Sequence, residues 1–253
     1  MSIRYVAIGD SFTEGVGDER EDGTPRGWAD RVAEKLTRVQ DEPVHYANLA
    51  IRGRLLGPII DEQLDAALSL EPTPTLISFN GGGNDMMRPR QSQENLVALI
   101  MGAVERCRAA GIDTVVLSGA DPSGGLPLGG LVRKRAGLLT AAISGLVESA
   151  GATFVDAFND PELPAPGYWS ADRLHLNSAG HKRVSNLVIR GLGYETGDLP
   201  APPAAARRTP RGEALYYREH VLPWIGRRLT GRSSGDGRAA KFGDWTPVVP
   251  AAS

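Results

Sequence analysis

The chain has 253 residues, of which 41% are hydrophobic and 23% are charged, and its formal net charge at pH 7 is −2. These values are ordinary for a soluble globular protein, and a net charge so close to zero gives no general argument for nucleic-acid binding. No stretch approaches the roughly 18 apolar residues of a membrane-spanning helix, and no basic segment followed by an apolar run precedes the first expected strand. Because the only cysteine is Cys107, no internal disulfide bond can form, and we expect a cytoplasmic location.

Short apolar runs alternate along the chain with segments that carry apolar residues at helical spacing. The expected strands are residues 3–8, 44–49, 75–79, 114–118 and 153–155. The expected helices are residues 28–39, 59–70, 93–110, 131–150 and 177–192. Brief runs rich in β-branched and aliphatic residues are typical of parallel strands that are buried on both faces. The alternation predicts a three-layer α/β/α sandwich around a five-stranded parallel sheet, and right-handed crossovers favour the flavodoxin-like strand order 2-1-3-4-5.

The composition changes after Gly193. Residues 199–206 are rich in proline and alanine, a pattern that is typical of an extended linker. We therefore expect one domain over residues 1–193, followed by a linker and a C-terminal extension over residues 194–253.

The charge is unevenly distributed between the two parts of the chain. Residues 201–253 contain nine basic and four acidic side chains, so their net charge is +5, against −7 for residues 1–200. Because opposite charges attract, we expect the extension to dock on the domain rather than to bind nucleic acid. Within it we expect a helix over residues 213–229, interrupted at Pro223, and a loosely packed segment over residues 231–237.

Ser11 follows directly after the first expected strand, in the sequence Gly-Asp-Ser. The carboxyl ends of parallel strands form the edge of an open α/β sheet at which ligands bind. If a helix begins there, its unpaired N–H groups face the same place, so a serine has donors for an oxyanion beside it. The structural alternative is that Ser11 only caps a helix.

His175 is the expected base for Ser11. A serine hydroxyl is a poor nucleophile until a base takes its proton, and an imidazole titrates near neutral pH. Asp172 lies three residues earlier, in the loop before the last expected helix, where its carboxylate can orient the imidazole and stabilise the charged form. The other candidate, His181, lies inside that helix and on another face, so we expect it to be a surface or packed residue.

Four sequence blocks follow one another at the ends of successive expected elements: Ser11, Asn48 to Gly53, Gly81 to Asp85, and Asp172 to His175. Through these blocks the chain resembles the SGNH/GDSL hydrolase superfamily from residue 9 to about residue 190. The resemblance implies an oxyanion hole formed by the backbone N–H groups of Ser11 and Gly53 and by the side-chain amide of Asn84.

The chain departs from the usual pattern of the superfamily at three positions. Phe12 replaces the leucine of the Gly-Asp-Ser-Leu motif, which is a packing change. Arg173 and Leu176 replace the glycine and proline of the usual Asp-Gly-x-His-Pro block. We therefore expect the pocket wall beside His175 to differ from that of the relatives.

These observations predict a serine ester hydrolase that forms an acyl-enzyme and uses no metal or organic cofactor. The expected substrate is a small-molecule ester with a small acyl group, such as an O-acetyl group on a sugar or metabolite. The alternatives on the same site are an acyltransferase, a thioesterase and a lysophospholipase. The alternative of another class is a non-catalytic carbohydrate or nucleotide binder, although Gly81 to Gly83 lack the Lys-Ser/Thr ending of a phosphate-binding loop. The sequence leaves the oligomeric state open.

Three other polar or reactive residues have structural interpretations. Asp10 is expected to accept hydrogen bonds from turn amides, and Asp85 to cap a helix rather than to take part in catalysis. Cys107 lies in the apolar row of an expected helix, so we expect it to be a core residue.

Overall fold

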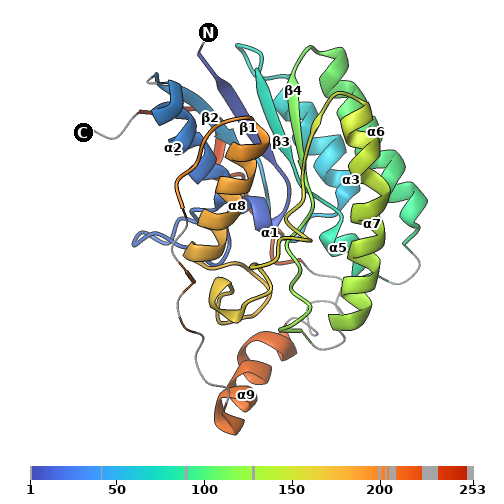
Figure 1. Cartoon of the computed structure of the whole chain (residues 1–253), viewed down its shortest axis with the longest axis vertical. Helices are drawn as coiled ribbons and strands as arrows, with labels where there is room; N and C mark the ends of the chain where they lie inside the picture. The colour runs from blue at the N-terminus through green and yellow to red at the C-terminus, as the bar shows by residue number, and fades with distance from the viewer. Residues whose placement is uncertain are drawn as a thin grey trace.

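The computed structural model describes residues 2–40, 42–88, 91–126, 129–198, 201–202, 204, 209–223 and 233–249. In this part of the chain a six-stranded sheet lies between two layers of helices (Figure 1). One layer contains α2 (Trp28–Gln40) and α8 (Ser178–Gly191), which pack against each other. The other contains α6 (Gln93–Ala109) and α7 (Gly129–Ser149). The predicted three-layer α/β/α architecture is therefore confirmed.

The sheet contains β1 (Arg4–Ile8), β2 (Val44–Asn48), β3 (Leu76–Phe79), β4 (Asp113–Leu117), β5 (Thr153–Val155) and β6 (Phe242–Val248). The first five strands are parallel and lie in the order β2-β1-β3-β4-β5, which confirms the predicted flavodoxin-like order. The sixth strand is a difference from the prediction of five. It comes from the C-terminal extension and pairs with β2 in the antiparallel direction.

The side chains of β1 alternate between two apolar cores. Tyr5 and Ala7 pack in the core that also contains residues of α2 and α8. Val6 and Ile8 pack in the core that contains residues of α6 and α7. All four side chains are fully buried, as a strand covered by helices on both faces requires. Cys107 is buried in the second core, which confirms its structural interpretation.

The helix expected over residues 59–70 is irregular. It consists of α3 (Leu56–Pro58), the π-helical segment η1 (Ile59–Leu64) and α4 (Asp65–Leu68). The buried side-chain amide of Gln63, within η1, accepts from the N–H of Gly9 at 2.8 Å and donates to its carbonyl oxygen at 3.0 Å. These two bonds fix the backbone two residues before Ser11.

Lys241 anchors the chain just before β6. Its ammonium group donates to Asp30 Oδ2 at 2.7 Å and to the carbonyl oxygens of Glu14 and Pro25 at 2.6 and 3.0 Å. The side chains of Lys241 and Asp30 are only 8% and 4% exposed. The antiparallel strand and this buried ion pair join the end of the extension to the sheet and to the start of α2.

The rest of the extension contains α9 (Pro210–Tyr216) and the π-helical segment η3 (Tyr217–Val221). The expected helix is therefore described only in its first part, because residues 224–229 lie outside the described residues. Residues 233–237 form hydrogen-bonded turns, and Gly235 packs so tightly that a Cβ there would lie 2.0 Å from the Arg52 carbonyl oxygen. The expectation of loose packing is thus wrong for Gly235, whereas Ser234, Asp236 and Gly237 are exposed.

Candidate active site

Ser11 is the first residue of the short helix α1 (Ser11–Glu14), which begins just after β1. Asp10 caps this helix, since its Oδ1 atom accepts a hydrogen bond at 3.1 Å from the N–H of Phe12. The structural role expected for Asp10 is therefore confirmed. At Gly9 the φ angle is +154°, and a Cβ would lie 2.5 Å from the Oγ1 atom of Thr13. Only glycine fits this turn, which places Ser11 at the carboxyl edge of the sheet.

Asp172 and His175 form a tightly bonded pair in the loop before α8. Oδ2 of Asp172 lies 2.6 Å from Nδ1 of His175, and Oδ1 accepts from the His175 backbone N–H at 3.0 Å. Ser170 donates a further hydrogen bond to Oδ1 at 2.7 Å. Burial opposes ionisation of Asp172, but the hydrogen bonds and the charge of His175 outweigh it and hold the pKa of this carboxyl well below its usual range. The carboxylate is therefore ionised and positioned to orient the imidazole.

Ser11 and His175 line the same cavity, whose volume is about 790 Å³. No hydrogen bond joins the Ser11 hydroxyl to the imidazole within the described part of the chain. Catalytic hydrogen bonds are commonly long in the absence of substrate and shorten in the complex. The structure thus places the predicted nucleophile and base on the wall of one cavity, without a direct hydrogen bond between their side chains.

Two unpaired backbone donors border this cavity. The N–H groups of Ser11 and Gly53 take part in no hydrogen bond among the described residues. Gly53 has a φ of +75°, the left-handed region that glycine adopts readily. Unpaired N–H groups beside a cavity are available to an incoming anionic oxygen.

Asn84 lies on α5 (Gly83–Met86) and also lines the cavity. Its Nδ2 atom donates to Oδ2 of Asp10 and to the carbonyl oxygen of Arg54, both at 3.0 Å. Both of its N–H groups are therefore occupied in this structure. The amide lines the same cavity as Ser11, and to donate to a bound ligand it must give up one of these two partners.

Asp10 has a second role that sequence reasoning missed. One oxygen caps α1 and the other accepts from Asn84, so a single carboxylate connects the Ser11 turn with α5. The residue is 5% exposed, and burial raises its pKa to about 6, against the effects of the Phe12 N–H and of His175. Its position directly before the predicted nucleophile was the only available sequence signal.

A partly buried ion pair fixes the loop that carries Gly53. The carboxylate of Glu14 accepts from the Arg52 backbone N–H at 2.6 Å and from its Nε and Nη2 atoms at 2.9 and 2.6 Å. Glu14 belongs to the same short helix as Ser11. The pair therefore holds Gly53 at a fixed position relative to Ser11, and no sequence pattern linked the two residues in advance.

The remaining candidate residues have structural contacts. Asp85 lies inside α5 rather than at its cap, and it accepts a hydrogen bond at 2.9 Å from the N–H of Leu56, the first residue of α3. His181 is fully buried; its Nδ1 accepts from the Trp28 N–H at 3.2 Å, and its Nε2 lies 3.3 Å from the Val16 carbonyl oxygen. Burial lowers the pKa of His181 to about 4. It is a packed residue and does not line the cavity.

The cavity wall has two chemically different parts. One part is apolar and comes from β3, β4, α6 and α7: Phe79, Ile100, Val116, Leu139 and Ile143. The other part comes from the C-terminal extension: Tyr216, Glu219, His220, Val221, Ser233 and Ser234. The extension is therefore part of the cavity wall, which the sequence did not indicate.

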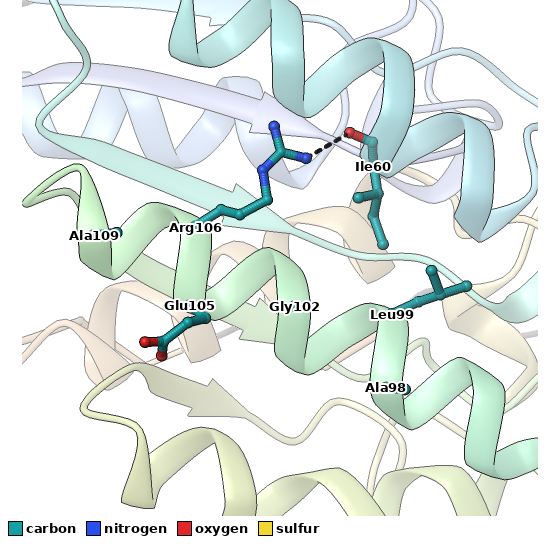
Figure 2. Close-up of a pocket in the computed structure, with 7 residues that line it drawn as sticks. All are labelled: Ile60, Ala98, Leu99, Gly102, Glu105, Arg106 and Ala109. Carbon is teal, nitrogen blue, oxygen red and sulfur yellow. Dashed lines mark hydrogen bonds between the residues drawn. The ribbon is translucent and has the colours of Figure 1, made fainter.

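Figure 2 shows a second hollow, with a volume of about 430 Å³, between α6 and η1. Arg106 spans it and donates to the Ile60 carbonyl oxygen at 3.4 Å. The described residues of its wall include no serine, cysteine or histidine. They are Ile60, Ala98, Leu99, Gly102, Glu105, Arg106 and Ala109. It therefore offers no nucleophile–base pair.

Two features are absent from the described residues. No cluster of three or more His, Cys, Asp or Glu side chains there is arranged to hold a metal ion. No helix among them is long and apolar enough to cross a membrane.

Residues 7–183 match the model of the GDSL-like Lipase/Acylhydrolase family. The chain therefore belongs to this family. It is accordingly a serine ester hydrolase, and the choice between an enzyme and a non-catalytic binder is decided in favour of the enzyme. A comparison with curated proteins gave no match.

Solved structures of several esterases share the fold. The lipase Lip_vut3 from a goat rumen metagenome has a TM-score of 0.61 and 20% identity, covering 75% of this chain and 97% of its own. Axe2, an acetylxylan esterase from Geobacillus stearothermophilus, has a TM-score of 0.58 and 17% identity, covering 76% of this chain and 95% of its own. The esterase EstA from Pseudoalteromonas sp. has a TM-score of 0.59 and 18% identity, covering 75% of this chain and 96% of its own. At these identities the likeness concerns the fold.

Proposed function

We propose that Ser11 is the nucleophile of this ester hydrolase and that the reaction passes through an acyl-enzyme. The observation that carries the proposal is the ionised Asp172 bonded to His175, on a cavity that Ser11 also lines. His175 takes the hydroxyl proton as Ser11 Oγ attacks the ester carbonyl carbon, and it then gives this proton to the leaving alcohol. Water, activated by the same imidazole, cleaves the acyl-enzyme and restores the free serine.

The oxyanion is bound by the N–H groups of Ser11 and Gly53, which have no other hydrogen-bond partner among the described residues. The third donor is Asn84, which exchanges its bond to Asp10 or to the Arg54 carbonyl oxygen for one to the oxyanion. Donors that are fixed before the reaction stabilise the charge that develops in the transition state. The Glu14–Arg52 pair and the cap at Asp10 supply this fixed geometry.

We further propose that the acyl group enters the apolar part of the cavity, beside Phe79 and Ile143. A volume of about 790 Å³ lies within the range of ligand-binding cavities, and its apolar wall favours alkyl chains of butanoyl to octanoyl length. A small acyl group such as acetyl, the sequence-based expectation, also enters this space but leaves most of the apolar wall without contacts. The catalytic domain of residues 1–193 then carries the chemistry. A cytoplasmic location is supported by the single cysteine, Cys107, which is buried.

Labelling with a fluorophosphonate probe tests the nucleophile. Intact-mass and peptide analysis should find one adduct, on Ser11, that is absent from Ser11→Ala. His175→Ala should lose about three or more orders of magnitude in kcat, whereas His181→Ala should lose far less. An adduct on Ser123 or Ser170, or equal losses for the two histidine variants, would show that the catalytic residues are assigned wrongly.

A series of p-nitrophenyl esters from acetate to palmitate tests the substrate. We expect kcat/KM to rise from acetate to a maximum between butanoate and octanoate, because each buried methylene adds apolar contact. A maximum at acetate would favour the O-acetyl substrates instead. Parallel assays with acyl-coenzyme A and lysophospholipid, with and without alcohol acceptors, separate the hydrolase from its thioesterase, lysophospholipase and acyltransferase alternatives.

A further inference from the structure

Arg173 has an unusual backbone conformation in the loop of the proposed catalytic residues. Its φ is +58°, and among the described residues it is the only non-glycine residue with a positive φ. Side chains with a Cβ rarely adopt this left-handed conformation, which glycine adopts freely. An arginine at this position, between Asp172 and His175, therefore requires compensating contacts of its side chain.

Those contacts are made with α9 of the C-terminal extension. The Nη1 and Nη2 atoms of Arg173 donate to the two carboxylate oxygens of Glu213 at 3.0 and 2.6 Å. The guanidinium carbon also lies 3.9 Å above the centre of the Tyr216 ring. Parallel hydrogen bonds to a carboxylate and stacking on an aromatic ring are the strongest contacts that a guanidinium makes.

Tyr216 lies at the point where three segments meet. It is 6% exposed, and its hydroxyl lies 3.4 Å from the carbonyl oxygen of Gly125, in the loop after β4. Gly125 in turn packs on Arg173, since a Cβ at Gly125 would lie 2.6 Å from the Arg173 Cβ. Arg173 lies in the loop from Asp172 to His175, and it thus connects this loop both to the loop that follows β4 and to the helix α9.

The segment fastened in this way faces the cavity. α9 lies beyond the carboxyl ends of the strands (Figure 1), and Tyr216, Glu219 and His220 line the cavity together with Ser11 and His175. These side chains are aromatic and polar, in contrast to the apolar wall supplied by α6 and α7. An alkyl chain fits against the apolar part of the wall. The polar part is then left for the alcohol half of an ester.

We propose that the segment from Pro210 to Val221 borders the alcohol half of the substrate and limits its size, and that Arg173 is the positioning residue that fixes this wall. The inference rests on the proposed function, in which Ser11 is acylated and the acyl group occupies the apolar part of the cavity. Arg173 acts through Glu213 and Tyr216 and takes no part in proton transfer.

Phenyl acetate and 2-naphthyl acetate provide the test in the full-length protein. Both esters form the same acetyl-enzyme, and their leaving phenols have similar basicity, so a difference in kcat/KM between them reports the space for the alcohol. Arg173→Gly keeps the backbone conformation and removes both side-chain contacts. We expect it to raise the 2-naphthyl to phenyl ratio of kcat/KM by at least about threefold, the scale on which the size of a pocket discriminates substrates.

Three controls distinguish this role from a general structural one. Glu213→Gln should raise the ratio in the same direction, and the charge-swapped pair Arg173→Glu with Glu213→Arg should bring it back toward the wild-type value. Arg211→Ala, at an exposed residue of the same helix that does not line the cavity, should leave the ratio unchanged. The ratio for phenyl octanoate against phenyl acetate should stay constant in all variants, because the acyl part of the wall is intact.

Each other outcome overturns the proposal. An unchanged or lowered naphthyl ratio in Arg173→Gly shows that Arg173 does not limit the alcohol, and a change confined to the octanoate ratio shows that the segment borders the acyl chain. Absence of fluorophosphonate labelling on wild-type Ser11 overturns the proposed function and the inference together. Labelling of Ser11 with wild-type ratios in every variant overturns the inference alone.

Discussion

Oδ2 of Asp172 lies 2.6 Å from Nδ1 of His175, and Oδ1 of the same carboxylate accepts the backbone N–H of His175. The acid therefore fixes both the ring and the main chain of the histidine. Asp172→Asn should lower kcat by roughly a thousandfold, because a neutral amide favours the wrong tautomer and does not stabilise the imidazolium. The measurement is steady-state hydrolysis of p-nitrophenyl butanoate. A loss below about tenfold would show that another group orients the imidazole.

Asn84→Ala should reduce kcat by about a hundredfold or more while KM changes little, since an oxyanion donor acts mainly in the transition state. The exposed Asn95→Ala on α6 is the control and should behave as wild type. If the substitution of Asn84 raises KM alone, its amide binds the ground-state substrate, and the proposed oxyanion hole loses one member.

Glu14→Gln should lower kcat by about tenfold to a hundredfold with little change in KM. The neutral amide weakens the bonds to Arg52 that hold the Gly53 N–H in place, and small displacements of a catalytic donor have large effects on rate. Glu62→Gln is the matched control, because Glu62 pairs with Arg54 in the same region but its side chain is 57% exposed. Equal kinetics for the two variants would argue that Glu14 does not position the oxyanion donor.

Asp10 predicts a specific pH dependence of stability. Its folded pKa of about 6 lies above the ordinary value of 3.8 for this side chain, so between these values the folded protein binds more protons than the unfolded chain. The free energy of unfolding contributed by Asp10 therefore falls as pH rises through this window. Relative to Asp10→Asn, wild type should lose about 2–3 kcal/mol between pH 4 and 7, as measured by urea denaturation. A constant difference across this range would show that the pKa is not raised.

Lys241→Met should destabilise the protein by about 3–5 kcal/mol, because it leaves the buried carboxylate of Asp30 without its partner. Chemical denaturation provides the measurement. The double variant Lys241→Met with Asp30→Asn should recover part of this loss, since it removes the unpaired charge. If the single variant is as stable as wild type, Asp30 finds another partner or takes up a proton at little cost.

The sequence predicted those features that depend on residues close to one another along the chain. The apolar runs of β1 to β5 and the Asp-x-x-His spacing each lie within a few residues, and the strand order and the Asp172–His175 pair follow from them. The cap of α8 is equally local, since Asn177 accepts from the N–H groups of Ala179 and Gly180.

Contacts between distant segments could not be predicted in this way. β6 contains Pro247, which argues against a central strand but is tolerated at a sheet edge, where it lies opposite His45. Lys241 and Asp30 are separated by 211 positions, and neither has a local motif. The contact of Arg173 with Glu213 likewise depends on the docking of α9, so the sequence indicated only that the wall beside His175 differs from that of the relatives.

The position of β6 after the five parallel strands has a consequence for biosynthesis. A nascent polypeptide folds from its N-terminal side as it leaves the ribosome, and β1 to β5 are all synthesised long before β6. Until Lys241 and β6 emerge, the outer edge of β2 has no partner strand, and unpaired edges invite contacts with other chains. The turns at residues 233–237, which pack on the loop before Gly53, emerge in the same interval. The sheet edge is therefore covered, and the cavity wall completed, only after β1 to β5 have been synthesised.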